Sequence, residues 1–454
     1  MKRRKFLKFA AGSAAGILLN GCSAPLGRSA RSNRKPNIIF IMADDLGFGN
    51  LGCYGGKKIL TPSVDRMARE GLRFTEVYAG HCVCAPSRSV LMTGQHTGHT
   101  RVRGNKCMTG GVKDEITGGG CRLPLLPEDV TVAEVLKQAG YATGITGKWG
   151  LGDPHTTGIP TRQGFDQWLG YLNQNHADDY YTEYLWRNEE KIVLEGNLNG
   201  KRSQYSHDLF AEFTLDFIRG HKDKPFFLYV PFTIPHFNHE APSSEPYTDK
   251  PWTEKEKIYA AKVTRMDKVI GRIFDLLKEL DIDGDTIVFF CSDNGGTLWG
   301  TLPPYRGGKG GLMEGGIRTP MVVRWPGKIK AGKVSDAQWY FADVMPTLAE
   351  LAGAKAPDNI DGISVVPTLF GKKQNELRER FMYWEQPRGL RQAVRWRNWK
   401  AKRKKRGAKL ELYNLTDDPG EYYDVAEKYP QISAVFAEYL KTARTETPNW
   451  PLDD

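Results

Sequence analysis

The sequence lacks the features that mark several large classes of protein. It has no series of long apolar runs, and its 40% hydrophobic and 26% charged residues are ordinary for a soluble globular chain. Seven cysteines among 454 residues are too few for a disulfide scaffold. These absences exclude a polytopic membrane protein and a largely disordered chain, whereas the length is ample for a large hydrophobic core.

Acidic residues are absent from residues 1–35, which carry nine lysines and arginines. The net charge of +11 at pH 7 is therefore concentrated in this segment, and only +2 remains for residues 36–454. Nucleic-acid-binding domains carry their positive charge on a folded surface. The nearly neutral remainder therefore argues against a nucleic acid as partner.

The first 22 residues have the pattern of an export signal. A basic start, MKRRKFLK, precedes a short apolar run and Cys22. Because the run is too short to span a bilayer comfortably, a cleaved signal is favoured over a transmembrane helix. RRKFLK resembles a twin-arginine signal, and LNGC resembles a lipobox in which Asn20 is unusual. We expect export to the periplasm or cell surface with a lipid on Cys22, or else a plain cleaved signal, followed by a tether to residue 35.

Helix-like and strand-like segments alternate from residue 36 onward. Short apolar runs predict buried strands, and amphipathic segments between them predict helices. The expected strands are 38–42, 141–146, 226–232 and 286–291, and the expected helices are 131–139, 209–218 and 263–280. This order predicts an α/β fold, with a mostly parallel sheet flanked by helices on both faces.

The composition changes after about residue 372 to short segments rich in aromatic and basic residues. Residues 391–415 predict a hairpin, and residues 426–443 predict a final helix. We therefore expect a large domain over 36–372 and a smaller C-terminal α+β domain with an antiparallel sheet over 373–454.

Polar residues follow the predicted strands at the edge where a parallel sheet binds its ligands. Asp44 and Asp45 follow the first strand, and Asp293 and Asn294 follow the last. Three carboxylates and an amide oxygen form a donor set that Ca²⁺ or Mg²⁺ prefers. Either pair alone is more often a helix or turn cap, but two pairs at equivalent strand ends favour a metal site.

A second group of reactive residues begins in the segment HCVCAPSRSVLMTG, residues 81–94. Cys84 stands just before a predicted helix that begins near Ser87, and a helix N-terminus favours an anion. Arg88 adds a positive charge one turn further, while Lys148 and His236 follow two other predicted strands. A cysteine in such a place is more often a packed thiol than a nucleophile, so the residues alone leave its role open.

The string CAPSR, which starts at Cys84, resembles the C-x-P-S-R signature of type I sulfatases. Five further segments resemble the family in the same order: PNIIFIMADDLGFGN, TGKWGLG, CSDNGG, GGKGGLMEGGIRTP and ELYNLTDDPGE. The resemblance covers nearly all of residues 36–425. Within the family, the sequence is similar to the arylsulfatase A and N-acetylgalactosamine-6-sulfatase group. It implies an alkaline-phosphatase-like fold, with the catalytic domain over 36–372.

The resemblance also implies that a maturation enzyme oxidises Cys84 to Cα-formylglycine. A thiolate would form a stable S-sulfonate, whereas an aldehyde hydrate attacks sulfur with one hydroxyl and expels sulfate through the other. The implied metal is Ca²⁺, with Mg²⁺ the alternative, held by the two strand-end pairs and modified Cys84. The implied catalytic roles are sulfate binding or nucleophile stabilisation by Arg88, Lys148 and Lys309, and general acid catalysis by His236.

The sequence departs from the family at Gly150, where the motif often has a histidine that orients the hydrate. His155 is the nearest replacement in sequence, with a solvated loop residue as the alternative. His176 follows GFDQWLGY, where family members place substrate-contacting side chains. His96 and His99 could line the pocket or pack behind it.

Two features outside the motifs have open interpretations. Cys107 and Cys121 bracket a glycine-rich loop and could pair in an oxidising periplasm. The basic run over 395–409 could bind a sulfated polymer or form a solvated strand face. Its Trp396 and Trp399 are three apart, so on a regular strand they would face opposite sides.

The sequence thus predicts an exported, lipid-anchored sulfatase that acts on a sulfated carbohydrate. One alternative is a phosphonate monoester or phosphodiester hydrolase of the same superfamily, and another is a catalytically silent lipoprotein that binds sulfated glycans. The expected partners are the carbohydrate, the maturation enzyme and the membrane through a lipid anchor only.

Overall fold

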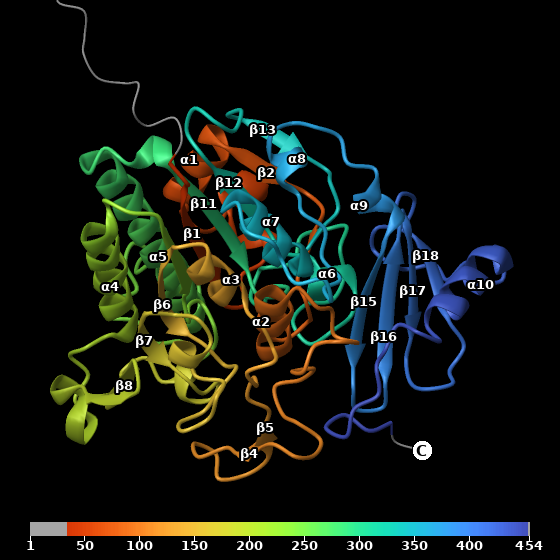
Figure 1. Ribbon diagram of the computed structural model, residues 1–454, viewed down its shortest axis with the longest axis horizontal. Coiled ribbons are helices and arrows are strands. Elements are labelled where there is room, and N and C mark those ends of the chain that lie inside the picture. The colour runs from red at the N-terminus through yellow and green to blue at the C-terminus, as the bar shows by residue number, and fades with distance from the viewer. Residues whose placement is uncertain (1–33, 453–454) are drawn as a thin grey trace, which may run out of the picture. The chain divides into compact units, whose positions relative to one another are not determined.

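The computed structural model of this protein describes residues 34–452 (Figure 1). A ten-stranded sheet with the order β13-β2-β12-β11-β1-β10-β6-β7-β8-β9 runs through it. Strands β11, β1, β10, β6 and β7 are parallel and form the centre, and antiparallel pairs extend both edges. The predicted export signal and Cys22 lie outside the described residues.

All the strands and helices predicted for the large domain are present. The strands are β1 (Asn37–Ala43), β2 (Leu72–Phe74), β6 (Ala142–Lys148), β7 (Gln167–Tyr171), β8 (Tyr184–Arg187), β9 (Glu190–Val193), β10 (Phe226–Pro231), β11 (Thr286–Ser292), β12 (Met321–Arg324) and β13 (Lys333–Ser335). The main helices are α1 (Pro62–Glu70), α2 (Cys84–Thr93), α3 (Val132–Gln138), α4 (Ser206–His221), α5 (Glu254–Glu279) and α7 (Val344–Leu351). Within residues 34–452, no helix combines the length and apolar character needed to cross a membrane.

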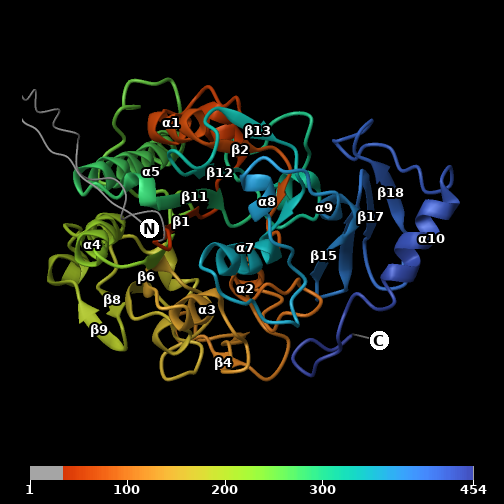
Figure 2. The ribbon, with the colours of Figure 1, turned by 45° about the horizontal axis from the view of Figure 1, so that its top comes forward.

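Two hydrophobic cores lie on opposite faces of the large sheet (Figure 2). Successive side chains of a strand point to opposite faces, so Phe40 and Met42 of β1 pack in the core that includes α2, α3 and α7. Ile39 and Ile41 pack in the core that includes α1, α4 and α5. Burial on both faces explains why β1 is a continuous apolar run rather than an alternating one.

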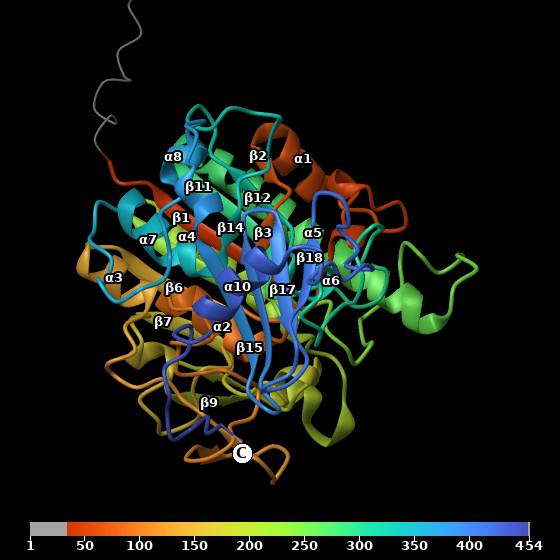
Figure 3. The ribbon, with the colours of Figure 1, turned by 90° about the vertical axis from the view of Figure 1, so that its right-hand side faces the viewer.

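A second, antiparallel sheet contains β15 (Phe381–Gln386), β16 (Arg391–Trp396), β17 (Trp399–Arg403) and β18 (Glu411–Asn414). Helix α10 (Pro430–Tyr439) packs against it (Figure 3). The sheet begins beyond the boundary predicted at residue 373. The expectation for Trp396 and Trp399 was wrong, because the chain turns between them and pairs them directly across β16 and β17, which places both side chains on one face.

Part of the basic run over 395–409 is buried in ion pairs. Lys400 is completely buried, with Nζ 3.0 Å from Glu314 and 3.1 Å from Glu421, and Arg395 lies 2.7 Å from Glu76. Glu314 begins α6 (Glu314–Ile317), so these pairs join the second sheet to the large domain. The exposed residues of the run lie in the two turns and at its end: residues 397–398, 404–407 and 409.

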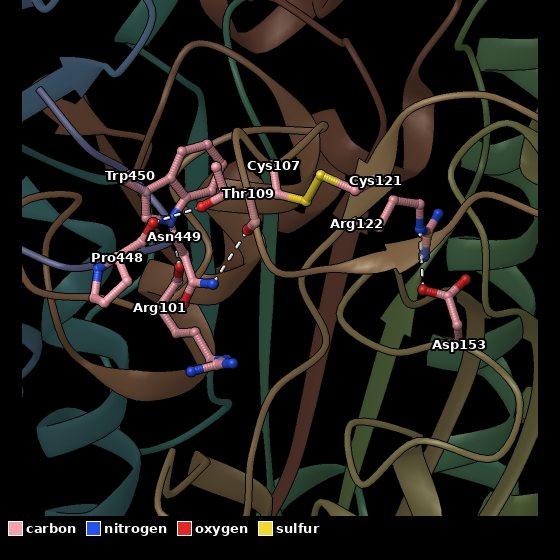
Figure 4. The surroundings of a disulfide bond; sticks show 9 residues. All are labelled: Arg101, Cys107, Thr109, Cys121, Arg122, Asp153, Pro448, Asn449 and Trp450. Atoms are coloured by element: carbon pink, nitrogen blue, oxygen red, sulfur yellow. Dashed lines mark hydrogen bonds and ion pairs between the residues drawn. A yellow bond between two sulfur atoms is a disulfide. The ribbon is translucent and has the colours of Figure 1, made fainter. Parts of the chain in front are cut away.

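Cys107 and Cys121 form a disulfide, so the structure decides the pairing that the sequence left open (Figure 4). The loop that it closes contains β4 (Val112–Lys113) and leads into β5 (Cys121–Arg122). Arg122 Nε donates to Asp153, 3.1 Å away, and Trp450 from the C-terminal end of the chain donates to Arg101 O. The disulfide loop is therefore fixed on one side to the segment after β6 and packed near the C-terminal residues on the other.

Candidate active site

The two predicted metal-binding pairs lie side by side at the carboxyl ends of β1 and β11. The last residues of these parallel strands are paired in register, so the residues that follow them are brought together. The Asp45 amide donates to Asp293 Oδ1 at 3.1 Å, and Asn294 Nδ2 donates to Asp45 Oδ1 at 2.8 Å. Asp44, Asp45, Asp293 and Asn294 are all completely buried.

Cys84 is the first residue of α2, three residues earlier than the predicted helix start. Its Sγ lies 3.4 Å from Asp44 Oδ1, and the residue is only 1% exposed. One potential ligand atom from each of Asp44, Asp45, Cys84 and His236 lies within 4.8 Å of the others. We call these four residues the central cluster.

Each carboxylate at the strand ends has a cation as its closest ion-pair partner, and Arg88 also lies 3.5 Å from Asp44. The guanidinium of Arg88 also donates a hydrogen bond from Nη1 to the Lys148 carbonyl, which fixes its position. With three negative and three positive side chains, this arrangement is electrically balanced. The closest pairs are Lys148 Nζ with Asp44 (2.6 Å), Lys309 Nζ with Asp45 (2.7 Å) and Arg88 Nη2 with Asp293 (2.9 Å).

Burial and these charges shift the pKa values of the site in different directions. Burial raises the pKa of Asp44, but the opposing charges, led by Lys148, outweigh it and hold that pKa well below its usual range. Burial and the neighbouring Asp44 raise the pKa of Asp293 to about 6. Burial and Asp44 also raise the pKa of the Cys84 thiol well above its usual value, so the unmodified side chain is a neutral thiol.

His236 lies in the loop after β10 and connects the central cluster to Asp178. Its Nε2 is 2.7 Å from Lys309 Nζ and 3.4 Å from Asp45 Oδ2. Its Nδ1 is 2.9 Å from Asp178 Oδ1, and neither of these two atoms has another polar partner among residues 34–452. A carboxylate at Nδ1 favours the Nδ1–H tautomer, which leaves Nε2 directed to the cluster.

Lys262 of α5 supports the His236 loop from within the protein. It is completely buried, and its Nζ donates to His236 O at 2.5 Å and to Asn238 O at 3.0 Å. The Tyr180 hydroxyl donates to the same His236 carbonyl at 2.9 Å. Burial lowers the pKa of Lys262 to about 7.

Gln174 fills the space next to Gly150, where the family motif often has a histidine. Gly150 has a φ of 82°, and a Cβ added to it would lie 1.9 Å from Gln174 Nε2. The Gln174 side chain is buried, and neither amide atom has a hydrogen-bond partner in the described part of the chain. The adjoining Asn173 and Asn175 both donate to Asp114, at 3.1 and 2.6 Å, which fixes the backbone on either side of this unpaired amide.

The structure does not bring His155 or His176 into the central cluster. His155 is exposed in a turn with a φ of 65°. His176 is buried between the rings of Tyr171 and Tyr184, and its Nε2 lies 2.7 Å from Thr182 Oγ1. His176 is therefore a packed histidine with a hydrogen bond inside the fold.

His96 and His99 form a separate group with Asp361. Their rings stack at 4.1 Å, and His99 Nδ1 lies 3.0 Å from Asp361. His96 Nδ1 accepts the Gly98 amide, so a neutral His96 carries its proton on Nε2, the atom that faces Asp361 at 3.6 Å. The three side chains thus pack together, with one potential ligand atom of each within 4.8 Å of the others.

Sequence reasoning missed three residues that the structure places around the site. Gln174 and Asp178 belong to the same segment as His176, and only the histidine was singled out because imidazole is the more common catalytic group. Lys262 had a signal in the sequence: a lysine at helical spacing from the buried positions Tyr259 and Met266 lies on the core face of its helix.

The matches to family models cover most of the chain. Residues 36–354 match the model described as Sulfatase, and residues 309–446 match the model described as N-sulphoglucosamine sulphohydrolase, C-terminal. The chain is 34% identical over 397 residues to N-acetylgalactosamine-6-sulfatase of Sus scrofa, which covers 82% of this chain and 70% of that protein. It is 32% identical over 448 residues to arylsulfatase A of Homo sapiens, which covers 86% and 83%.

A solved structure has the same architecture. The crystal structure of Ps i-CgsB in complex with k-i-k-neocarrahexaose is similar with a TM-score of 0.80 and 27% identity, over 92% of this chain and 95% of that one. The mostly parallel sheet with a C-terminal antiparallel sheet is thus the alkaline-phosphatase-like fold that the resemblance implied. The chain belongs to the sulfatase family and is a sulfuric ester hydrolase.

Proposed function

We propose that this chain is an exported sulfatase that hydrolyses a sulfate ester of a carbohydrate, with a formylglycine made from Cys84 and a Ca²⁺ ion. The observation that carries the proposal is the central cluster. Two carboxylates, a buried cysteine at a helix N-terminus and a histidine meet at the ends of parallel strands, where such sheets bind ligands.

The residues at the strand ends fit a divalent cation. Asp44, Asp45, Asp293 and Asn294 offer only oxygen ligands, which hard cations prefer. Asn294 Oδ1 is buried without a hydrogen-bond partner among the described residues, and a buried carbonyl oxygen is costly unless something pairs with it. A set of four protein oxygens suits Ca²⁺ better than Mg²⁺, which keeps several waters and is held by only one or two carboxylates. When bound, the cation would lower the pKa of the nucleophile and neutralise charge on the sulfate.

Formylglycine at position 84 would supply a hydrate, one hydroxyl of which attacks sulfur while loss of the proton of the other expels sulfate and restores the aldehyde. Side chains of the protein bind the sulfate group and supply a proton to the leaving group. Arg88, Lys148 and Lys309, which donate to the strand-end carboxylates, would bind the sulfate oxygens by charge-assisted hydrogen bonds. The ester S–O bond breaks, the alcohol leaves, and one water is consumed in each cycle.

His236 holds the proton that the leaving alkoxide oxygen takes. The Asp178 carboxylate keeps a proton on Nδ1 and stabilises the imidazolium, so the second proton is presented from Nε2 toward the cluster. Lys309, 2.7 Å from the same Nε2, orients this nitrogen when no leaving group is present.

A carbohydrate is the substrate class that the surroundings of His236 support. Phe237 is 52% exposed, its ring lies 4.2 Å from that of His236, and Lys309 Nζ lies 5.6 Å from its centroid. An exposed aromatic ring beside the general acid offers a flat apolar face on which a sugar ring can pack. The related N-acetylgalactosamine-6-sulfatase and the carrahexaose complex of Ps i-CgsB point to the same substrate class.

The evidence for the proposed localisation comes from the sequence of residues 1–35. Their basic start, short apolar run and Cys22 support export with a lipid anchor at the periplasmic face or cell surface. Sulfated polysaccharide fragments arrive there, and a separate maturation enzyme must act on Cys84 before the chain can work.

Sulfate release by enzyme co-produced with a formylglycine-generating enzyme tests the proposal. We expect turnover of an aryl sulfate and of at least one sulfated saccharide, and loss of both in Cys84→Ala. Faster turnover of an aryl phosphodiester would instead identify a phosphodiester hydrolase. Glycan binding without turnover by the matured protein would identify a lectin.

A further inference from the structure

A pocket of about 230 Å³ lies beside the central cluster, and the turn between β15 and β16 forms one of its walls. It is smaller than the pockets that hold drug-sized ligands, about 300–1,000 Å³, so it suits one charged sugar residue. Four of the residues that line it are basic: Arg103, Lys106, Arg388 and Arg391. No acidic residue lines it.

Three of these four cations have no counter-charge among residues 34–452. Arg103 is buried and lies 3.3 Å from Glu385, so its charge is compensated. Lys106, Arg388 and Arg391 are exposed, and none makes a side-chain hydrogen bond or ion pair with any residue from 34 to 452. A single exposed arginine is ordinary. Three unpaired cations around one concave surface create a positive potential that favours an anion.

Two residues in the wall of the pocket lie next to residues of the catalytic centre. Val83 in its wall immediately precedes Cys84, so their Cα atoms are about 3.8 Å apart. Gln386, also in the wall, donates from Nε2 to the carbonyl of Gly310, the residue after Lys309, at 2.8 Å. A molecule that reaches from the central cluster into this pocket therefore crosses only a short distance.

We propose that this pocket binds a second anionic group of the substrate, a carboxylate or a second sulfate on the same carbohydrate. The proposal rests on the proposed function for the sulfate that is cleaved. The guanidinium group of arginine can donate two parallel hydrogen bonds to the oxygens of a carboxylate or of a sulfate. Arg388 and Arg391 could therefore bind either group. The enzyme would then prefer polyanionic saccharides over saccharides with one sulfate.

The test compares two sulfated disaccharides that differ only in a second anion, with that anion either a uronate carboxylate or a second sulfate. The readout is the ratio of kcat/KM for the disaccharide with the second anion to kcat/KM for the one without it. In the double variant Arg388→Gln/Arg391→Gln this ratio should fall about tenfold or more. The fall should come from a higher KM for the disaccharide that carries the second anion. Lys372→Gln/Lys373→Gln removes the same charge from an exposed site elsewhere and should keep the wild-type ratio.

An unchanged ratio in Arg388→Gln/Arg391→Gln, for both kinds of second anion, would overturn the proposal. A fall for only one kind would identify the group as the carboxylate or the sulfate. Binding measured by calorimetry with Cys84→Ala separates this question from the chemistry. If the two pocket substitutions weaken binding of the dianionic disaccharide there, the pocket is supported even where no sulfate is released. Equal affinity would contradict it.

Discussion

Single residues in this site act by setting the charge or proton position of a neighbour. Asp178 has no role in the cluster itself, yet its carboxylate decides which nitrogen of His236 carries a proton. Gln174 stands next to the glycine that replaces a family histidine, with a buried and unpaired amide. Neither residue could be selected from the sequence, because their functions depend on which side chains they meet across the fold.

Asp178→Asn should reduce kcat by about 10–100-fold with a sugar sulfate, since the amide no longer stabilises the imidazolium of His236. An aryl sulfate should lose much less activity, because its leaving group departs without a proton. Steady-state kinetics with both substrates provides the measurement. His236→Ala is the control and should show the same pattern, and the double variant should be little worse than His236→Ala alone. Equal losses on both substrates would contradict the assigned role.

Gln174→Leu should raise the free energy of unfolding by about 1–3 kcal/mol, because a buried unpaired amide is replaced by an apolar side chain of similar shape. We expect kcat to fall by roughly tenfold at the same time, since the substitution changes the side chain packed against Gly150, two residues after Lys148. Urea unfolding and sulfate release measure the two effects. Lower stability with unchanged kcat would show that the amide serves only the fold.

Elements were easier to predict than the contacts between them. The apolar strands predicted that the residues after β1 and β11 would lie together, as they do, because parallel strands end at the same edge. The spacing of Trp396 and Trp399 was misleading, since a turn between them cannot be seen from residue separation alone. The basic run was likewise misread in part, because Lys400 pairs with glutamates that are far away in the sequence.

Helix α5 has a specific function in holding the His236 loop. Lys262→Met removes the hydrogen bonds to the carbonyls of His236 and Asn238, so the histidine should lose its position and kcat should fall by about tenfold. Arginine at this position should restore part of the activity, because it can donate to the same carbonyls. A methionine variant with wild-type kcat would show that Tyr180 alone is sufficient.

At the scale of the whole molecule, the second sheet is attached to the large domain by buried charges. Lys400→Met removes the nearest buried cation from both Glu314 and Glu421, whose nearest remaining cations are then Arg318 at 3.2 Å and Lys402 at 3.5 Å. We therefore expect a loss of about 3 kcal/mol in the free energy of unfolding, the lower end of the cost of breaking a buried ion pair. Lys404→Met is the matched control: Lys404 pairs with Glu411 at the surface, so its loss should change the free energy of unfolding much less. Denaturant unfolding gives the free energy of unfolding of both variants. Equal losses in the two variants would contradict a stabilising role for the buried Lys400 pairs.

Stability should also fall on acidification below about pH 6.5. Burial lowers the pKa of His81, His96 and His176 to about 4, and that of His207 to about 3, from an ordinary value of 6.5. Between about pH 4 and pH 6.5 the unfolded chain therefore binds more protons than the folded one, so the free energy of unfolding rises with pH across this window. Urea unfolding at pH 7 and at pH 5 should give a lower free energy of unfolding at pH 5. His176→Gln should reduce this difference, and an unchanged difference would contradict the assignment for His176.

The central claim is that the nucleophile of this enzyme is an aldehyde hydrate made from Cys84 and not the thiol itself. Mass spectrometry of the peptide that spans residue 84 gives the converted fraction in preparations made with different amounts of the maturation enzyme. We predict that sulfate release per molecule is proportional to that fraction and vanishes when it is zero. Full activity in a preparation whose Cys84 is unconverted would contradict the account.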